Sequence, residues 1–190
     1  MFNIFKSFNI AYGHSVWKQT LNHKLATDCK LACRHLHGHN ADVVIHVDAD
    51  QLDHKGMVLD FKELGFVKKF LDDVVDHKMI LDIEDPALKL FLQSFDITND
   101  DSYAHHLTYH DDGKYYTINK SYYAELSLRE QEIYSGMIIV NFIPTAENLA
   151  LWIYEYCQSK LEGITDVSKV QIFETPKACA EYIPLKKINK

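Results

Sequence analysis

The chain has few cysteines, two arginines and no long apolar run among its 190 residues. Its four cysteines form no Cys-x-x-Cys pair, so we expect no disulfide framework and a reducing, cytoplasmic location. No stretch approaches the ~20 apolar residues of a membrane span. The first six residues lack the charged region and the apolar run of a signal peptide. These absences predict a cytoplasmic protein with no membrane partner.

The charge balance argues against a further class of function. The formal net charge is −7, whereas a general nucleic-acid binder normally carries a basic field. The length is close to that of one domain, and 47% hydrophobic and 25% charged residues are ordinary for a globular protein. We therefore expect a single domain over residues 1–190 that has no nucleic-acid partner.

The apolar pattern predicts strands at both ends of the chain. Strand patterns occur in five segments, namely residues 2–12, 39–48, 56–60, 170–174 and 180–183. We expect the third segment to be a hairpin partner of the second, with Asp53 to Gly56 supplying the turn.

Two helices are predicted from a 3.6-residue period. The first begins at Phe61 and ends near Asp76 and His77. The second opens at Pro144 and Thr145, where Thr145 can act as the N-cap. Strands followed by helices and further strands predict an α+β fold with an antiparallel sheet and two helices on one face.

Residues 86–136 fit neither period. They contain seven of the eleven tyrosines and eight acidic residues. We interpret them as an insertion, too aromatic for a disordered linker and folded onto the domain surface.

Eleven histidines point to metal chemistry. In His37-Gly38-His39 the two imidazoles face the same side of an extended strand, and the glycine lets a metal approach closely. His14, on the first strand, can supply a third nitrogen if the two strands pair. Three imidazoles at ~2.0–2.1 Å leave the open fourth position of a catalytic zinc site. The alternative is a chance pair in a histidine-rich chain.

Two further groups of residues could act in catalysis or binding. Cys33 precedes His37 by four residues, and a thiol beside a cation acquires thiolate character. Asp76 can orient the imidazole of His77. Glu174, at a strand end, can accept a pair of hydrogen bonds from an amidine-like N–H edge such as that of a pterin. Taken singly, each has a more common non-functional interpretation: a small buried thiol, a surface helix end and a solvated strand end.

These pieces, in this order, resemble the 6-pyruvoyltetrahydropterin synthase superfamily, most closely its bacterial carboxytetrahydropterin branch. The resemblance rests on Phe-Asn-Ile-Ala-Tyr-Gly-His at 8–14, Cys-Arg-His-Leu-His-Gly-His-Asn at 33–40, Gly-Met-Val-Leu-Asp-Phe at 56–61, Asp-His at 76–77, Pro-Thr-Ala-Glu-Asn at 144–148, and Glu-Thr at 174–175 with Ala-Glu-Tyr at 180–182. The four-residue spacing from Cys33 to His37 favours this branch. Cys29 is a possible confounder, but its flanking residues match no motif.

The resemblance implies a tunnelling fold, in which subunit sheets join into a barrel, and a homo-oligomer that is commonly a hexamer of two trimers. It also implies roles for individual residues. Zinc would be held by His14, His37 and His39; Cys33, Asp76 and His77 would be catalytic; and Glu174 would anchor the pterin, with Thr145 and Arg34 as further substrate-binding residues.

The implied activity is that of a lyase in 7-deazaguanine (queuosine) biosynthesis. It would convert 7,8-dihydroneopterin triphosphate to 6-carboxy-5,6,7,8-tetrahydropterin, acetaldehyde and triphosphate. The alternatives are the pyruvoyl activity of tetrahydrobiopterin synthesis and a non-catalytic pterin-binding homologue. Lys24, Lys30 and Arg34 are candidates for a basic rim that binds the triphosphate. His105, His106 and His110 have a spacing that would suit a metal on a helix.

Overall fold

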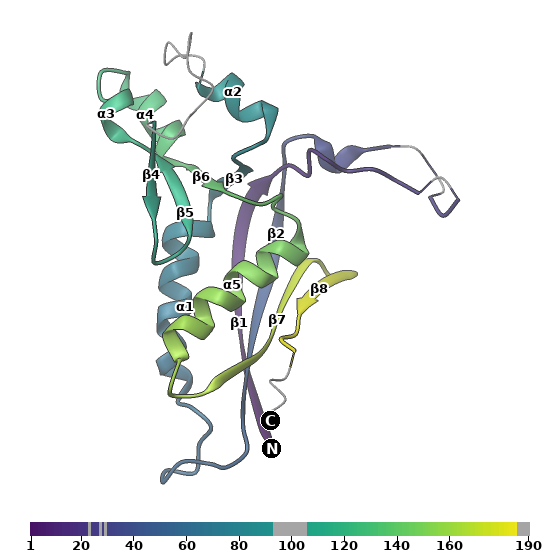
Figure 1. Cartoon of the computed structure of the whole chain (residues 1–190), viewed down its shortest axis with the longest axis vertical. Coiled ribbons are helices and arrows are strands. Elements are labelled where there is room, and N and C mark those ends of the chain that lie inside the picture. Colours follow the sequence, from purple (N-terminus) through teal and green to yellow (C-terminus); the bar gives the residue numbers. More distant parts are fainter. Residues whose placement is uncertain (23, 27, 29, 93–105, 186–190) are drawn as a thin grey trace. The chain divides into compact units, whose positions relative to one another are not determined.

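The computed structural model describes residues 1–190 except 23, 27, 29, 93–105 and 186–190. The described residues form a mixed α+β fold with one large sheet, whose strands hydrogen-bond in the order β4-β5-β6-β3-β1-β2-β7-β8 (Figure 1). The strands are β1 (Phe2–His14), β2 (His37–Ala49), β3 (Lys78–Asp82), β4 (Leu107–His110), β5 (Tyr115–Ile118), β6 (Met137–Val140), β7 (Asp166–Thr175) and β8 (Ala178–Tyr182).

The α-helices are α1 (Gly65–Phe70), α2 (Pro86–Leu92), α3 (Lys120–Tyr123), α4 (Leu128–Ser135) and α5 (Ala146–Leu161). Short 3-10 helices are η1 (Ala32–Arg34) and η2 (Phe61–Leu64), and a π-helical turn, η3 (Leu71–Val75), extends α1. Within the described residues, no helix is both long and apolar enough to cross a membrane.

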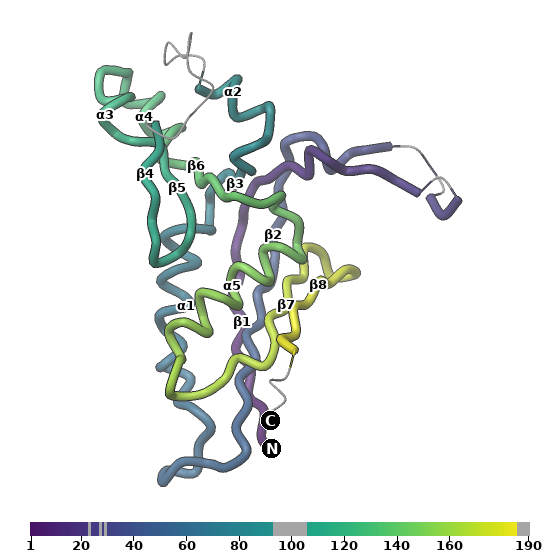
Figure 2. The backbone as a smooth tube through the Cα atoms, viewed as in Figure 1, coloured from purple at the N-terminus to yellow at the C-terminus, as the bar shows by residue number. Residues whose placement is uncertain are grey.

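The chain groups into two compact units. Unit 1 comprises Met1–Ala11, His39–Asp76 and Ala146–Lys190, and unit 2 comprises Tyr12–Gly38 and His77–Thr145. Strands β1 and β2, whose backbones Figure 2 traces, are neighbours in the sheet, and each has residues in both units.

In unit 1, strand alternation and helix periodicity produce the expected elements. Residues Val43, Ile45 and Val47 of β2 are fully buried, and β2 pairs antiparallel with β7. Helix α5 packs against β7 and β8, and the ring of Phe70, at the end of α1, stacks on Tyr156 of α5 with centroids 3.9 Å apart. The helices at residues 61–76 and 146–161 and the strands near both chain ends are therefore confirmed.

In unit 2, the sheet is mixed rather than antiparallel. Strand β3 runs parallel both to the end of β1, with His14 opposite Ile80, and to β6, with Ile80 opposite Ile138. The prediction of an antiparallel sheet was wrong here because β3 and β6 are short apolar runs. Parallel strands that are largely buried, as these are, show no alternation.

The hairpin strand predicted at 56–60 is absent, although the turn before it is present. Asp53 Oδ1 accepts hydrogen bonds from the backbone N–H of Lys55 and Met57, and Gly56 has φ +78°. Asp60 then caps η2 in a capping box with Glu63. The chain starts a helix at Phe61, so these residues do not pair as a strand.

The described parts of segment 86–136 contribute to an apolar core. Its described elements are α2, β4, β5, α3 and α4. They share an apolar cluster with β3 and β6 that consists of Leu81, Leu88, Leu92, Leu107, Ile118, Tyr123, Tyr134, Met137 and Ile139. The described part of the segment therefore shares a core with β3 and β6, and its interpretation as an insertion stays a prediction.

Candidate metal centre and active site

Three histidines come together where β1 ends and β2 begins. Strand β1 ends at His14, and β2 begins with His37-Gly38-His39. One ring nitrogen from each histidine lies within 4.8 Å of those of the other two. His14 is 2% exposed, so its imidazole is taken out of water at the cluster. The predicted approach of His14 to the His-Gly-His pair is confirmed.

Backbone carbonyl groups set the tautomers of two of these rings. Nδ1 of His14 lies 2.5 Å from the carbonyl oxygen of Pro144, and Nδ1 of His37 lies 2.8 Å from that of His35. A carbonyl oxygen only accepts, so each Nδ1 carries the proton and donates. This tautomer has the lone pair of the neutral ring on Nε2, which is the form of a metal-ligating histidine.

The two Nε2 atoms of His14 and His37 lie 3.1 Å apart. This distance is close to the spacing that one metal ion imposes on two of its ligands, since tetrahedral zinc with ligands at ~2.0–2.1 Å places its nitrogens roughly 3.3 Å apart. The donor set thus fits a tetrahedral N-ligated metal such as zinc.

Gly38 allows β1 and β2 to approach each other at the cluster. A Cβ atom at this position would lie 2.9 Å from the carbonyl oxygen of Tyr12. The glycine is thus needed for close contact between two backbones. The sequence predicted that Gly38 makes room for a ligand or a metal. In the structure, the group that approaches Gly38 closely is the backbone of β1.

Glu174 lies beside one of the three histidines. Its Oε1 is 3.9 Å from Nε2 of His39, and the two side chains are 24% and 20% exposed. Glu174 is on β7 and His39 on the neighbouring strand β2, so the pairing of these strands positions both. A carboxylate proposed to bind a pterin therefore lies next to a candidate metal ligand.

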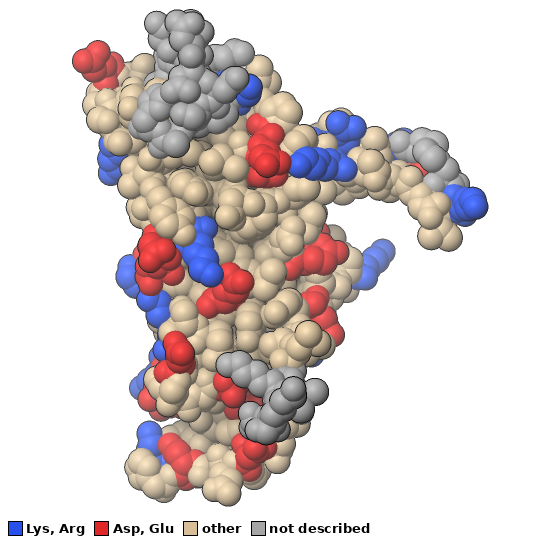
Figure 3. Space-filling view, viewed as in Figure 1, with Lys and Arg blue, Asp and Glu red and all other residues tan. Residues whose placement is uncertain are grey.

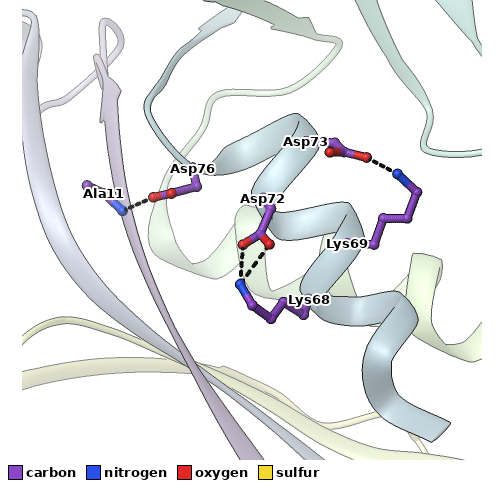
Figure 4. A network of polar contacts seen from close by, with 6 residues as sticks. All are labelled: Ala11, Lys68, Lys69, Asp72, Asp73 and Asp76. Atoms are coloured by element: carbon purple, nitrogen blue, oxygen red, sulfur yellow. Dashed lines mark hydrogen bonds and ion pairs between the residues drawn. The ribbon is translucent and has the colours of Figure 1, made fainter. Parts of the chain in front are cut away.

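Asp76 and His77 follow η3 at the end of the first helical segment. Asp76 Oδ1 accepts a hydrogen bond of 2.7 Å from the backbone N–H of Ala11 on β1 (Figure 4). His77 is exposed and has φ +56°, a left-handed backbone conformation that is uncommon for residues other than glycine. Asp76 is thus anchored to β1, and its action on His77 stays a prediction.

Cys33 and Arg34 lie in η1, four and three residues before His37. The Cys33 side chain is half-buried, and its carbonyl oxygen accepts a hydrogen bond of 2.7 Å from the backbone N–H of Val16. Arg34 is exposed, as are Lys24 and Lys30. Thr145 is half-buried and directly follows Pro144. The catalytic and substrate-binding roles of these residues stay predictions.

Two other possibilities raised by the sequence concern a metal site at His105, His106 and His110, and the thiol of Cys29. His110 closes β4 and bonds Thr117 Oγ1 at 2.8 Å, and residues 107–110 form a strand, so His106 and His110 do not share a helix face. The idea of a helical metal site there was wrong. Cys29 and His105 lie outside the described residues.

The sequence interpretation missed the carbonyl groups of Pro144 and His35. A backbone acceptor leaves no trace in residue type. For Pro144 the available signal is its place directly before the second helix, where the chain turns. For His35 the signal is its place two residues before a ligand, within reach of that ligand's own ring.

The chain matches known proteins over nearly its whole length. The family model described as 6-pyruvoyl tetrahydropterin synthase matches residues 3–184. The chain belongs to this family. It is 30% identical over 191 residues to the 6-carboxy-5,6,7,8-tetrahydropterin synthase of Aquifex aeolicus, a match that covers 94% of this chain and 96% of that one.

Solved structures extend the comparison. A crystal structure of an uncharacterized protein from Wolinella succinogenes is 35% identical, with a TM-score of 0.88 and coverage of 97% of this chain and 98% of that chain. The 6-pyruvoyl tetrahydropterin synthase of Caenorhabditis elegans matches at 17% identity and a TM-score of 0.53, over 97% and 96%. The second likeness shows the fold alone. The first spans nearly the whole of both chains, so segment 86–136 is not extra length relative to that protein.

Proposed function

We propose that the chain converts 7,8-dihydroneopterin triphosphate and water to 6-carboxy-5,6,7,8-tetrahydropterin, acetaldehyde and triphosphate. This is a lyase reaction that would serve 7-deazaguanine (queuosine) biosynthesis in the cytoplasm. The supporting observation is the cluster of His14, His37 and His39, in which the Nε2 atoms of His14 and His37 lie 3.1 Å apart and Glu174 lies beside His39. The activity named for the Aquifex aeolicus relative supports the choice within the family.

The metal in this proposal is zinc, held by His14, His37 and His39. When bound, it supplies Lewis-acid chemistry that acidifies hydroxyl groups and carbons next to carbonyls on the substrate side chain. The hydrogen bonds from His14 to Pro144 and from His37 to His35 keep both ring orientations fixed.

Each remaining residue then has one task. The Glu174 carboxylate accepts two N–H bonds from the pterin ring and orients it. Cys33, as a thiolate, moves protons between the ring and the side chain of the substrate. His77, oriented by Asp76, transfers protons in the later steps, when water splits the side chain between its carbons.

The triphosphate requires cations on an acidic chain. In the view of Figure 3, basic side chains are interspersed among acidic ones on the described surface. We assign binding of the triphosphate to Arg34, Lys24 and Lys30. Lys24 and Lys30 lie in the segment between β1 and η1, Arg34 is the last residue of η1, and all three are exposed. Thr145 is a further substrate contact. Replacing Arg34 with alanine then raises KM more for the triphosphate than for dihydroneopterin.

The proposed assembly is a homo-oligomer, a hexamer of two trimers in which the sheets of the subunits join into barrels. It rests on the family resemblance. The molar mass in solution, measured by light scattering, tests it. A monomer at assay concentration contradicts it.

The deciding experiment is a mass-spectrometric product assay on zinc-loaded protein given 7,8-dihydroneopterin triphosphate. A carboxytetrahydropterin with stoichiometric acetaldehyde supports the proposal. A pyruvoyl product would support the metal centre but assign the chain the alternative activity, that of tetrahydrobiopterin synthesis. If fully zinc-loaded protein gives no product, the remaining alternative is a pterin-binding homologue without turnover.

Cys33→Ala is the matched variant for this assay. It keeps one zinc per chain, because the thiol is not among the three ligands, and it loses turnover by at least about 100-fold, as expected for a proton-transfer residue. Undiminished turnover would remove the catalytic role of the thiol.

A further inference from the structure

The three residues after His14 are each tied to another part of unit 2. The Ser15 hydroxyl donates to Asp85 Oδ2, and the indole Nε1–H of Trp17 donates to Asp82 Oδ2 at 2.9 Å. Between them, the backbone N–H of Val16 donates to the carbonyl oxygen of Cys33 at 2.7 Å. The segment that leaves the metal ligand is therefore held at three successive residues.

The two acceptor carboxylates are buried and fully engaged. Asp82 is 3% exposed and Asp85 is 4% exposed. Their other oxygens accept from backbone N–H groups nearby, namely Glu84, in the turn before α2, on Asp82 Oδ1 at 3.1 Å, and Ala87, in the first turn of α2, on Asp85 Oδ1 at 2.8 Å. Buried carboxylates are retained only when such partners compensate their lost hydration, and a fully satisfied network is rigid.

His14 needs support of this kind. It is the last residue of β1, so strand pairing constrains the chain before His14 but not the chain after it. Its Nε2 lies 3.1 Å from that of His37, so a small shift of the end of β1 changes the distance between these two candidate ligand atoms. A rigid attachment directly after His14 limits such shifts and keeps the ligand spacing fixed.

We propose that Asp82 and Asp85 are positioning residues of the metal centre, acting on His14 through the donors Trp17 and Ser15. The same attachment holds the η1 turn, because Val16 binds the carbonyl of Cys33. The inference rests on the metal centre of the proposed function. It adds two buried carboxylates that neither the metal ligands nor the proposed proton-transfer groups include.

Metal affinity is the readout, measured by titrating the metal-free protein with Co²⁺ and recording its visible absorption. Ser15→Ala leaves Asp85 Oδ2 without its donor, and Trp17→Phe does the same to Asp82 Oδ2 while keeping an aromatic ring. Each variant binds Co²⁺ about 10-fold more weakly, the lower end of the effect of outer partners of metal ligands. The band positions shift, because the geometry of His14 relaxes.

Glu84→Gln is the matched control. Glu84 lies between the two carboxylates on the same turn, but its side chain is exposed and pairs with Lys18 at 2.9 Å. Because an exposed ion pair contributes little, this variant keeps the Co²⁺ affinity within about 2-fold of that of the unchanged protein. Circular dichroism confirms that all the variants compared are folded.

A double-variant cycle separates positioning from general weakening. If Asp85 acts through Ser15, then Ser15→Ala combined with Asp85→Ala lowers Co²⁺ affinity no more than Asp85→Ala alone. Additive losses, or unchanged affinity and spectrum in both Ser15→Ala and Trp17→Phe, overturn the inference. Unchanged protein that binds Co²⁺ but makes no carboxytetrahydropterin overturns the function and not the positioning. Protein that binds no Co²⁺ overturns both.

Discussion

The two units differ in how their strands are built. In unit 1, β2 and β7 are long and pair over Asp42–Asp48, and α5 packs against β7. In unit 2, β3 and β6 are five and four residues long, run parallel and are almost wholly buried. A long strand that is buried on one face has a sequence in which apolar and polar residues alternate. A short strand that is buried on both faces has only a run of apolar residues. Unit 2 nevertheless contains His14, His37, Cys33 and His77, so the unit that is harder to predict carries more of the proposed chemistry.

The largest effect is expected from His37→Ala compared with His46→Ala. Both histidines are on β2, but His37 lies in the cluster, whereas His46 Nε2 bonds Gln171 Oε1 at 2.8 Å. Without His37 we expect no stoichiometric zinc and a loss of turnover of at least about 1,000-fold, since both the Lewis acid and its geometry are gone. His46→Ala keeps the zinc. Zinc analysis of the two purified variants measures the difference, and equal zinc contents would contradict the assignment of His37 as a metal ligand.

Gly38→Ala compared with Gly65→Ala gives the next effect. A Cβ at Gly38 meets the Tyr12 carbonyl oxygen at 2.9 Å, so β1 and β2 separate at the histidines. We expect a stability loss of about 1–3 kcal/mol and about 10-fold weaker metal binding.

Gly65 serves as its control. It has φ −65°, and a Cβ there meets nothing within 4 Å. Gly65→Ala should stabilise unit 1 by about 0.5–1 kcal/mol. Urea unfolding and metal titration measure both variants, and equal behaviour would remove the special role of Gly38.

The buried thiol of Cys157 in unit 1 gives a smaller, pH-dependent effect. Burial raises the pKa of Cys157 from 9.0 to about 12. Below pH 9 the thiol is neutral in both the folded and the unfolded chain. Above pH 9 only the unfolded chain loses the proton, so stability falls by about 1 kcal/mol between pH 9 and 10. Cys157→Ala removes this slope. Native protein should also react with a thiol reagent at the half-buried Cys33 before Cys157.

The smallest effect is expected at the ion pairs of the first helical segment (Figure 4). Lys68 contacts both carboxylate oxygens of Asp72, and Lys69 contacts Asp73, all four side chains being exposed. Asp72→Asn and Asp73→Asn should leave the urea midpoint unchanged within error. Asp76→Ala, which removes the acceptor of the Ala11 N–H, should cost about 1–2 kcal/mol. A loss at Asp72 as large as that at Asp76 would contradict this ranking.

These comparisons show what the sequence alone could predict. The His37-Gly38-His39 pair was readable because a period of two aligns both rings, and the second helix because Thr145 and an apolar stripe mark its start. Strand β6 was not readable, since Met137–Val140 is a run of four apolar residues that fits a strand or a helix equally well.

The carboxylates of Asp82 and Asp85 were missed for a different reason. Asp-Ile-Glu-Asp after an apolar run has the composition of a solvated loop, and burial to 3% and 4% depends on donors almost 70 residues earlier in the chain. The cluster of His14 with His37 was predictable only on the condition that β1 and β2 pair. Its tautomers were not, because they depend on two carbonyl oxygens.

The left-handed backbone at His77 makes this position informative about selection. With φ +56°, any residue with a side chain bears a conformational cost there, and glycine bears none. Neutral drift at this position should therefore run toward glycine or asparagine. A set of related sequences that keeps histidine would record selection for the imidazole itself, against the preference of the backbone. The fold alone does not require histidine at position 77.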